Sequence, residues 1–376
     1  MKKPNRSLLH NDGLQTLISS LLCILGGLIV GYLVLLIIEP KGALDAILAV
    51  MKSFFRFTGR SRMKYFGQNL VRTVPLIMCS LSVLFAYKVG MFNIGVAGQY
   101  VAGACGALYA ALAWKLHWLP CLLIGMAAAA LLGVIAGFLK TKCNVNVVIS
   151  GIMLNWIALY LTNLILGQVK SPMSPYTLSL MGTNPSAKLP SLGMEKLFSG
   201  ESSISIAIPL AIVIAVVIHI VLHKTSFGYE LKATGHNYHA AKYAGMKEDR
   251  NIILTMAISG ALAGLGAGLL FLTGIEDWET TISSVPAMGF NGIAVAFLGG
   301  LSPIGSILSA FFVQYISFGG GNVDLQVYCS QISSLISSLI IYLCAFVAFF
   351  KYIIQLYLRK RKEKQEALFT KGGDET

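Results

Sequence analysis

The chain has 376 residues, of which 56% are hydrophobic and only 12% are charged. A soluble domain carries about twice that charged share, and a soluble fold cannot hide so many apolar side chains from water. The net charge of +13 lies between and beyond the apolar runs, so it indicates no nucleic-acid surface. These numbers exclude an ordinary soluble enzyme and a nucleic-acid-binding protein, and they predict a protein embedded in a lipid bilayer.

The apolar runs predict an all-α fold: a polytopic membrane helical bundle of about ten transmembrane segments, since roughly 20 apolar residues span a bilayer as a helix. The predicted segments are Leu14–Ile38, Asn69–Tyr87, Ile94–Trp114, Leu119–Leu139, Val145–Leu166, Ile204–Leu222, Ile252–Thr273, Val285–Leu298, Pro303–Phe318 and Ile332–Phe350. The eighth and ninth are short, so they form either two crossings or a broken, re-entrant pair. The connections are short, so residues 1–376 form a single transmembrane domain.

The positions of Lys and Arg predict that the N- and C-termini are both cytoplasmic, because cytoplasmic segments are enriched in these residues. The basic tail 352–376 fits this orientation as an anchor on anionic lipid. The basic segment Glu39–Gln68 is an exception on the outer side. Its apolar residues recur near helical spacing, so it is either an amphipathic helix on the outer surface or a sign that the topology differs there.

Polar side chains inside two spans indicate faces that avoid lipid. One face of the fifth span combines Asn144, Gly151, Asn155 and Thr162. The last span carries a stripe of serines, namely Ser330, Ser333, Ser334, Ser337 and Ser338. These stripes are explained either by hydrogen bonds between helices or by a route for a hydrophilic solute.

Two segments rich in glycine predict interruptions of the membrane helices. Gly90–Gln99 contains three glycines, and its Asn93 and Gln99 are polar at membrane depth. Gly289–Gly292, with Asn291, resembles a second, distant version of this break. Unpaired backbone at membrane depth is tolerated only where it lines a cavity or is buried in protein. We therefore predict a translocation path lined by Asn93, Gln99, Asn155 and Asn291, with a structural hinge as the alternative.

Several features expected of a self-powered or catalytic protein are missing from the sequence. The acidic residues lie outside the spans or at their ends, no phosphate-binding loop occurs, and no catalytic or metal-binding set is evident. This pattern favours a pore that is driven by another chain. A self-sufficient carrier or facilitator is the second hypothesis. An intramembrane enzyme that uses Glu276, Asp277 and Glu279 is the third.

The inner loop 224–250 is the place where a driving partner is expected to bind. Its residues predict two short helices across the cytoplasmic face, with breaks at Gly228, Gly235 and Gly245. Such helices dock into grooves of soluble partners. The alternative is a merely solvated connector.

Four motifs resemble the permease subunits of bacterial ATP-binding-cassette importers, in the branch shared with branched-chain amino acid and ribose permeases. They are Gly90–Gln99, Phe227–Gly245, Gly289–Ala296 and Leu298–Gly305. The F-N-I-G-x-x-G-Q form of the first motif is similar to that of nucleoside permeases, also described as simple-sugar permeases. The resemblance implies a bacterial plasma-membrane importer for a nucleoside or a related sugar.

The resemblance also implies partners and a coupling site. The partners are a second homologous permease, cytoplasmic ATPase subunits that bind ATP and Mg, and an extracytoplasmic lipoprotein or periplasmic solute-binding protein. This chain itself then needs no cofactor and no metal. The implied ATPase-coupling positions are Gly228, Leu231, Ala233, Gly235, Asn237, Ala240, Ala241 and Gly245. Lys232, His236 and Tyr238 depart from the residues common in the family.

Overall fold

The computed structural model describes residues 12–169 and 176–322, and then positions 335, 338–339, 342–343, 346, 349–353 and 355–357. The longer helices are α1 (Asp12–Ile38), α2 (Ala43–Lys52), α3 (Gly59–Tyr87), α4 (Val96–Leu112), α5 (Trp118–Cys143), α6 (Val147–Leu166), α8 (Ala207–Lys224), α9 (Ser226–His236), α11 (Glu248–Phe271), α12 (Ala287–Leu298) and α13 (Pro303–Gly320). The shorter ones are α7 (Leu180–Thr183), α10 (Tyr238–Tyr243), η2 (Ser53–Arg56), η3 (Pro185–Ala187) and η4 (Met194–Phe198).

The described helices agree with a protein that crosses a membrane many times. Seven of them, α1, α3, α5, α6, α8, α11 and α13, are long and apolar enough to span a bilayer. Two shorter apolar helices, α4 and α12, complete nine of the predicted segments. The tenth, Ile332–Phe350, lies largely outside the described residues, as do Ser330, Ser333, Ser334 and Ser337 of the serine stripe. The count of ten crossings therefore stays a prediction.

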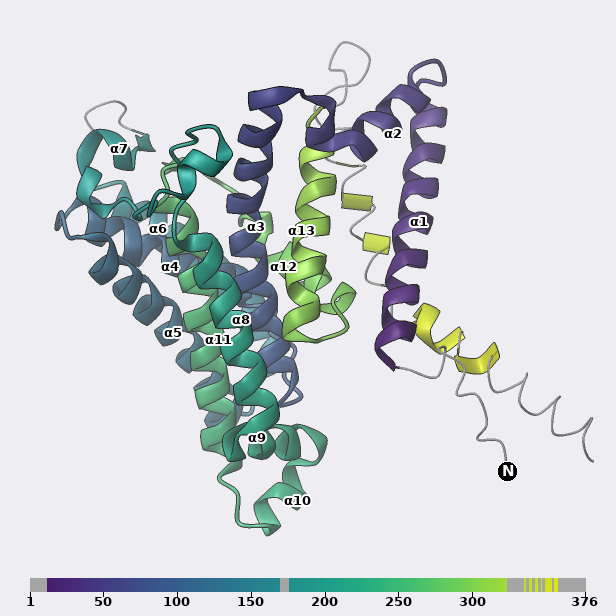
Figure 1. Ribbon diagram of the computed structural model, residues 1–376. Coiled ribbons are helices and arrows are strands. Elements are labelled where there is room, and N and C mark those ends of the chain that lie inside the picture. Colours follow the sequence, from purple (N-terminus) through teal and green to yellow (C-terminus); the bar gives the residue numbers. More distant parts are fainter. Residues whose placement is uncertain are drawn as a thin grey trace, which may run out of the picture.

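The bundle has two distinct ends (Figure 1). Helices α9 and α10 project from one end, and α1 begins on the same side. Helices α2 and α7 lie at the opposite end. We call these the α9–α10 end and the α2–α7 end. A two-stranded antiparallel ribbon of β1 (Thr177–Leu178) and β2 (Trp278–Glu279) is a small departure from a purely helical fold.

Small residues allow the central helices to approach closely. A Cβ atom on Gly137 of α5 would lie 3.0 Å from the Cα of Ile253 in α11. A Cβ on Gly264 of α11 would lie 2.7 Å from the carbonyl oxygen of Gly125 in α5. Because lipid tails are as apolar as the side chains, close van der Waals contact of this kind is what holds such helices together.

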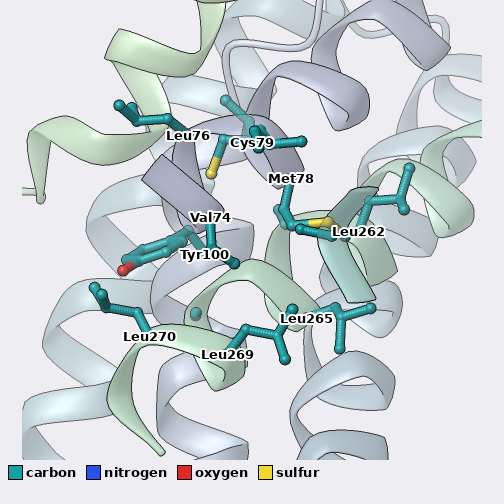
Figure 2. Packing of buried hydrophobic residues seen from close by; sticks show 14 of the residues in the cluster. Val74, Leu76, Met78, Cys79, Tyr100, Leu262, Leu265, Leu269 and Leu270 are labelled. Carbon is teal, nitrogen blue, oxygen red and sulfur yellow. The ribbon is translucent and has the colours of Figure 1, made fainter. Parts of the chain in front are cut away.

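A cluster of larger apolar side chains fills the space beside these close helix contacts (Figure 2). Residues of α3 face residues of α11, and the ring of Tyr100 from α4 lies between them. The labelled members are Val74, Leu76, Met78, Cys79, Tyr100, Leu262, Leu265, Leu269 and Leu270. Helices α3, α4, α5 and α11 thus form the packed centre that positions the candidate site.

The basic segment 39–68 is not a single surface helix. It folds as α2 and η2, and α3 already begins at Gly59, ten residues before the predicted start of that span. Ala43, Ala46 and Val50 of α2 are buried, and Val50 contacts the backbone of Gly319 in α13. The predicted helix therefore exists at the α2–α7 end, but part of its apolar face packs on protein.

Candidate functional site

The predicted break at Gly90–Gln99 is confirmed. Helix α3 ends at Tyr87 and α4 begins only at Val96. Gly90 has a φ of 75°, a left-handed conformation that glycine adopts without the steric cost of a side chain. Residues 91–93 then run without helical structure, so α4 starts inside the bundle instead of at its end.

Asn155 of α6 caps the buried start of α4. Its Oδ1 accepts a hydrogen bond from the backbone N–H of Gly98 at 2.7 Å, and its Nδ2 donates to the carbonyl of Ile94 at 3.1 Å. Asn155 is 2% exposed, so both backbone groups would otherwise be buried without a partner. A Cβ on Gly98 would lie 2.7 Å from this Oδ1, which explains the glycine.

Asn93 ties α4 to α3 and α11. Its Nδ2 donates to Gln99 Oε1 and to Ser259 Oγ, both at 2.9 Å. Ser259 in turn donates to the backbone carbonyl of Ser82 at 2.9 Å. The Oδ1 of Asn93 and the Oγ1 of Thr255 are buried without a partner among the described residues. The break is therefore a polar node inside the apolar centre.

The second break lies elsewhere than predicted. Gly289 and Gly292 lie inside α12, which runs without interruption from Ala287 to Leu298. The interruption precedes the helix, in the non-helical segment 280–286 that follows β2. Gly289 serves close packing instead, since a Cβ there would lie 2.7 Å from the Cβ of Ala97.

The starts of α4 and α12 therefore meet in the interior, and the two helices run in opposite directions from this point. Helix α12 runs toward the α9–α10 end, because the ring of Phe297 lies 5.7 Å from that of Tyr87 at the end of α3. Helix α4 runs toward the α2–α7 end, where the carbonyl of Ala111 accepts a hydrogen bond from Asn184, the residue directly after α7, at 2.9 Å. Two helix N-termini, each with a partial positive charge, thus converge inside the bundle.

The four predicted path residues lie in different surroundings in the structure. Asn93 and Gln99 share one buried network. Asn155 caps α4 beside that network, whereas Asn291, in the second turn of α12, is half-buried and stands apart. Their path-lining role stays a prediction.

Two serines of the polar node, Ser82 and Ser259, are absent from the predicted set. Their hydroxyl oxygens lie 2.8 Å apart and join α3 to α11. The two residues are 177 positions apart in the sequence. Serine is also common in ordinary helix packing, so no local pattern signals this pairing.

The two short helices predicted in the inner loop are confirmed as α9 and α10, but their boundary differs from the prediction. Gly228 and Gly235 lie within α9, and the break falls at Asn237. The Oδ1 of Asn237 accepts from the backbone N–H of Ala240 at 3.0 Å, which makes it the N-cap of α10. Gly245 has a φ of 80° and follows α10.

Polar contacts hold this loop to the bundle. Asn251 of α11 donates to Thr234 of α9 at 3.3 Å. Tyr238 donates to Asp249 at 3.0 Å, and Asp249 pairs with Lys142 of α5 at 3.2 Å. Burial raises the pKa of Tyr238 to about 12, and the carboxylate of Asp249 adds to the shift. The phenol therefore stays protonated and keeps donating at any physiological pH.

Gly235 packs directly against the break between α3 and α4. A Cβ on it would lie 2.8 Å from the carbonyl carbon of Val89 and 2.9 Å from the amide nitrogen of Gly90. Burial and the nearby charge of Lys232 lower the pKa of Lys88 in the same turn. Helix α9 is thus in backbone contact with the segment that leads into the polar node.

The predicted coupling residues divide between the inner and the exposed side of the loop. Gly228, Leu231 and Ala241 are buried, Ala233 and Gly235 are half-buried, and Asn237, Ala240 and Gly245 are exposed. The exposed side also carries Tyr229, which is 65% exposed, and Tyr243, which is 93% exposed. Large aromatic side chains held out into solvent are typical of a surface that binds a partner.

The third hypothesis assigns catalysis to Glu276, Asp277 and Glu279. One of these three residues has a structural role. Glu276 forms an ion pair with Arg72 of α3 at 2.9 Å, while Asp277, just before β2, and Glu279, within β2, are exposed. Within the described part of the chain, no group of three or more His, Cys, Asp or Glu residues is arranged to hold a metal ion. The carboxylate nearest to α3 is therefore engaged in an ion pair.

Two helix starts converge inside an apolar bundle with many candidate spans, and the α9–α10 loop packs on the segment that leads to one of them. These features define a multi-pass membrane protein of the transporter type. The chain belongs to the family described as branched-chain amino acid transport system / permease component, whose model matches residues 65–348.

Nucleoside and guanosine transporter permeases are among the individual relatives. The chain is 32% identical over 355 residues to the guanosine ABC transporter permease protein NupP of Bacillus subtilis (strain 168), covering 93% of this chain and 98% of that one. It is 32% identical to the nucleoside ABC transporter permease protein NupB of Lactococcus lactis subsp. cremoris (strain MG1363), covering 81% and 85%. It is also 28% identical to NupQ of Bacillus subtilis (strain 168), a second guanosine ABC transporter permease protein, covering 66% and 78%.

Proposed function

We propose that this chain is the permease subunit of an ATP-binding-cassette importer that moves a nucleoside across the bacterial plasma membrane. The observation that carries the proposal is the backbone contact between Gly235 of α9 and the break at Val89–Gly90. It joins a partner-binding loop to the interior of the bundle. NupP and NupB, each 32% identical to this chain, are permeases of guanosine and nucleoside transporters.

In this proposal the α9–α10 end faces the cytoplasm. Both termini then lie in the cytoplasm, and ten segments cross the membrane. The basic tail 352–376, most of which lies outside the described residues, is assigned to the cytoplasmic side, where anionic lipid attracts it. The α2–α7 end faces outward and receives solute from a lipoprotein or periplasmic binding protein.

The energy comes from partner chains. Cytoplasmic ATPase subunits bind ATP and Mg, and their closure displaces α9 through the exposed face that carries Tyr229 and Tyr243. The contact at Gly235 passes this displacement to the segment leading to Asn93 and the start of α4. The bundle then alternates between an outward and an inward opening, as bistable packed elements allow.

A second permease completes the pathway. Two different guanosine transporter permeases of one organism, NupP and NupQ, are both similar to this chain, which supports a pair of homologous subunits. A neutral, polar solute suits a bundle that offers amides and hydroxyls. A nucleoside has this character, because its sugar carries hydroxyls and its base carries donors and acceptors but no net charge.

The test removes the exposed aromatic side chain from the docking face. Tyr243→Asp is expected to abolish co-purification of the ATPase and to lower ATP-driven guanosine uptake into proteoliposomes at least about tenfold, as loss of an interface hot spot does. Leu192→Asp, also an exposed apolar position but at the α2–α7 end, is the control for ATPase binding.

The alternative, a self-sufficient carrier, makes the opposite prediction. Full nucleoside accumulation by the isolated chain in liposomes without ATP would overturn the proposal.

A further inference from the structure

Two aromatic side chains stand on the outer face of α6 near the middle of that helix. Trp156 and Tyr160 are stacked with ring centroids 6.0 Å apart and an interplanar angle of 24°. They are 42% and 58% exposed. Trp156 lies ten residues before the end of α6 at Leu166, or about 15 Å along the axis, and Tyr160 lies about 9 Å from that end.

Hydrocarbon is a poor environment for this pair. Trp and Tyr are enriched at the membrane–water interface, where their polar atoms meet water or headgroups. A polar group in the bilayer core costs free energy unless it is hydrogen-bonded. The indole N–H of Trp156 and the phenol of Tyr160 have no hydrogen-bond partner among the described residues. Protein or water therefore suits their exposed side better than hydrocarbon does.

A polar, non-helical segment of the chain also contacts α6. The non-helical segment 280–286 is held to α6 by Asn163, whose Nδ2 donates to the carbonyl of Ile282 at 2.7 Å. The same Asn163 accepts from the indole of Trp278 at 3.2 Å. Asn163 lies three residues after Tyr160, hence one turn along the same face of α6.

The segment runs from the level of Asn163 to Gly289, which contacts Ala97. Ala97 lies beside the Gly98 that Asn155 caps. The segment therefore passes the levels of Tyr160 and Trp156 on α6.

Segment 280–286 exposes hydroxyls and backbone. Ser283 and Ser284 are exposed. Within the part of the chain that the structure describes, no acceptor is found for the backbone N–H groups of Ser283, Ser284 and Val285. Irregular backbone at membrane depth persists only where it lines a water-filled cavity or is covered by protein.

We propose that Trp156, Tyr160, Ser283 and Ser284, the aromatic strip, line the route of the nucleoside from the α2–α7 end to the starts of α4 and α12. The planar base stacks on the two rings, and the sugar hydroxyls exchange hydrogen bonds with the serines and their N–H groups. The strip matches both halves of a nucleoside, because every base presents a π face and the ribose presents hydroxyls. This inference rests on the proposed function and adds the residues that recognise the base.

The aromatic strip ends at the starts of α4 and α12. Segment 280–286 leads directly into α12, whose Gly289 contacts Ala97 at the start of α4. Phe290, in the same turn, is 41% exposed. A base that leaves Trp156 therefore reaches the two converging N-termini along one continuous segment of the chain.

The experiment uses the complete transporter, with both permeases, the ATPase and the binding protein, in proteoliposomes. The double variant Trp156→Ala/Tyr160→Ala is expected to lower guanosine uptake at least about 5-fold, as loss of base stacking does. Trp156→Phe/Tyr160→Phe keeps two rings and is expected to retain most of the uptake. Ile157→Ala is the matched control, since Ile157 is 56% exposed at the same depth on α6.

Two further measurements distinguish a strip that binds solute from a contact between subunits. Co-purification of the second permease and ATP hydrolysis stimulated by the binding protein are expected to stay unchanged in the double alanine variant. Loss of the second permease would make the rings a subunit contact, and unchanged uptake would make them a lipid-facing pair; either result overturns the inference. Absence of ATP-driven uptake in the unmodified transporter would instead contradict the proposed function itself.

Discussion

The starts of α4 and α12 are built from similar residues but are held in opposite ways. The start of α4 is capped by Asn155 and tied by Asn93 to Ser259, with all three side chains buried. Among the described residues no side chain caps the start of α12, which follows a largely exposed segment. Its Asn291 is half-buried.

In the proposed function the buried start of α4 is a fixed structural part, and the less enclosed start of α12 is the one that contacts solute. The segment that leads to the start of α4 is also the one that α9 contacts, through Gly235 and the turn at Val89–Gly90. On the proposed function, a displacement of α9 by the ATPase reaches α4 first, and the groups at the start of α12 exchange hydrogen bonds with the solute. Three substitutions test this division.

The largest effect is expected at the cap of α4. Asn155→Leu keeps the volume but leaves the N–H of Gly98 and the carbonyl of Ile94 buried without partners. We expect a loss of about 2–4 kcal/mol in the free energy of unfolding, since each unsatisfied buried group costs about 1–3 kcal/mol. Thermal unfolding of the purified chain in detergent measures it. Asn291→Leu is the matched control and should unfold like the unmodified chain; equal stability of both variants would show that the two helix starts are held alike.

Much of the helical scaffold could be predicted from the sequence. The predicted span Val145–Leu166 differs from α6 by two residues at its start, because apolar periodicity and length determine such helices. The break at Gly90–Gln99 is equally predictable, because its glycines come with polar side chains at membrane depth.

The details of the site could not be predicted in this way. The sequence pattern predicts a helix break at Gly289, yet this residue lies in a helix and packs on Ala97. Glycine serves both purposes, and only the tertiary neighbour decides between them. Asn155 likewise bonds backbone groups 57 and 61 residues earlier in the chain. No local spacing encodes such a pairing, so the sequence alone indicates a path residue and gives no sign of the structural cap.

The second prediction concerns the contact that moves the fixed start. Gly235→Val places a side chain against the backbone of Val89 and Gly90, where there is no space for one. We expect ATP-driven uptake to fall at least about tenfold, because overpacking of this kind costs about 1–3 kcal/mol. The ATPase should remain bound, which co-purification checks.

Ala244→Val is the control for this contact, since Ala244 is exposed in the same loop. Normal transport is expected there. If Gly235→Val also transports normally, α9 does not act through the turn at Gly90, and the ATPase must reach the bundle by another contact.

The smallest effect is expected at the available start. Asn291→Ala removes one amide that we assign to solute, so uptake should fall about threefold, the range of a single hydrogen bond. Stability should not change, and Asn291→Gln should restore part of the uptake by returning the amide. Guanosine uptake and thermal unfolding, measured on the same preparations, decide the outcome. A marked loss of stability in Asn291→Ala would show that α12 is locked like α4, and the two helix starts would then be equivalent after all.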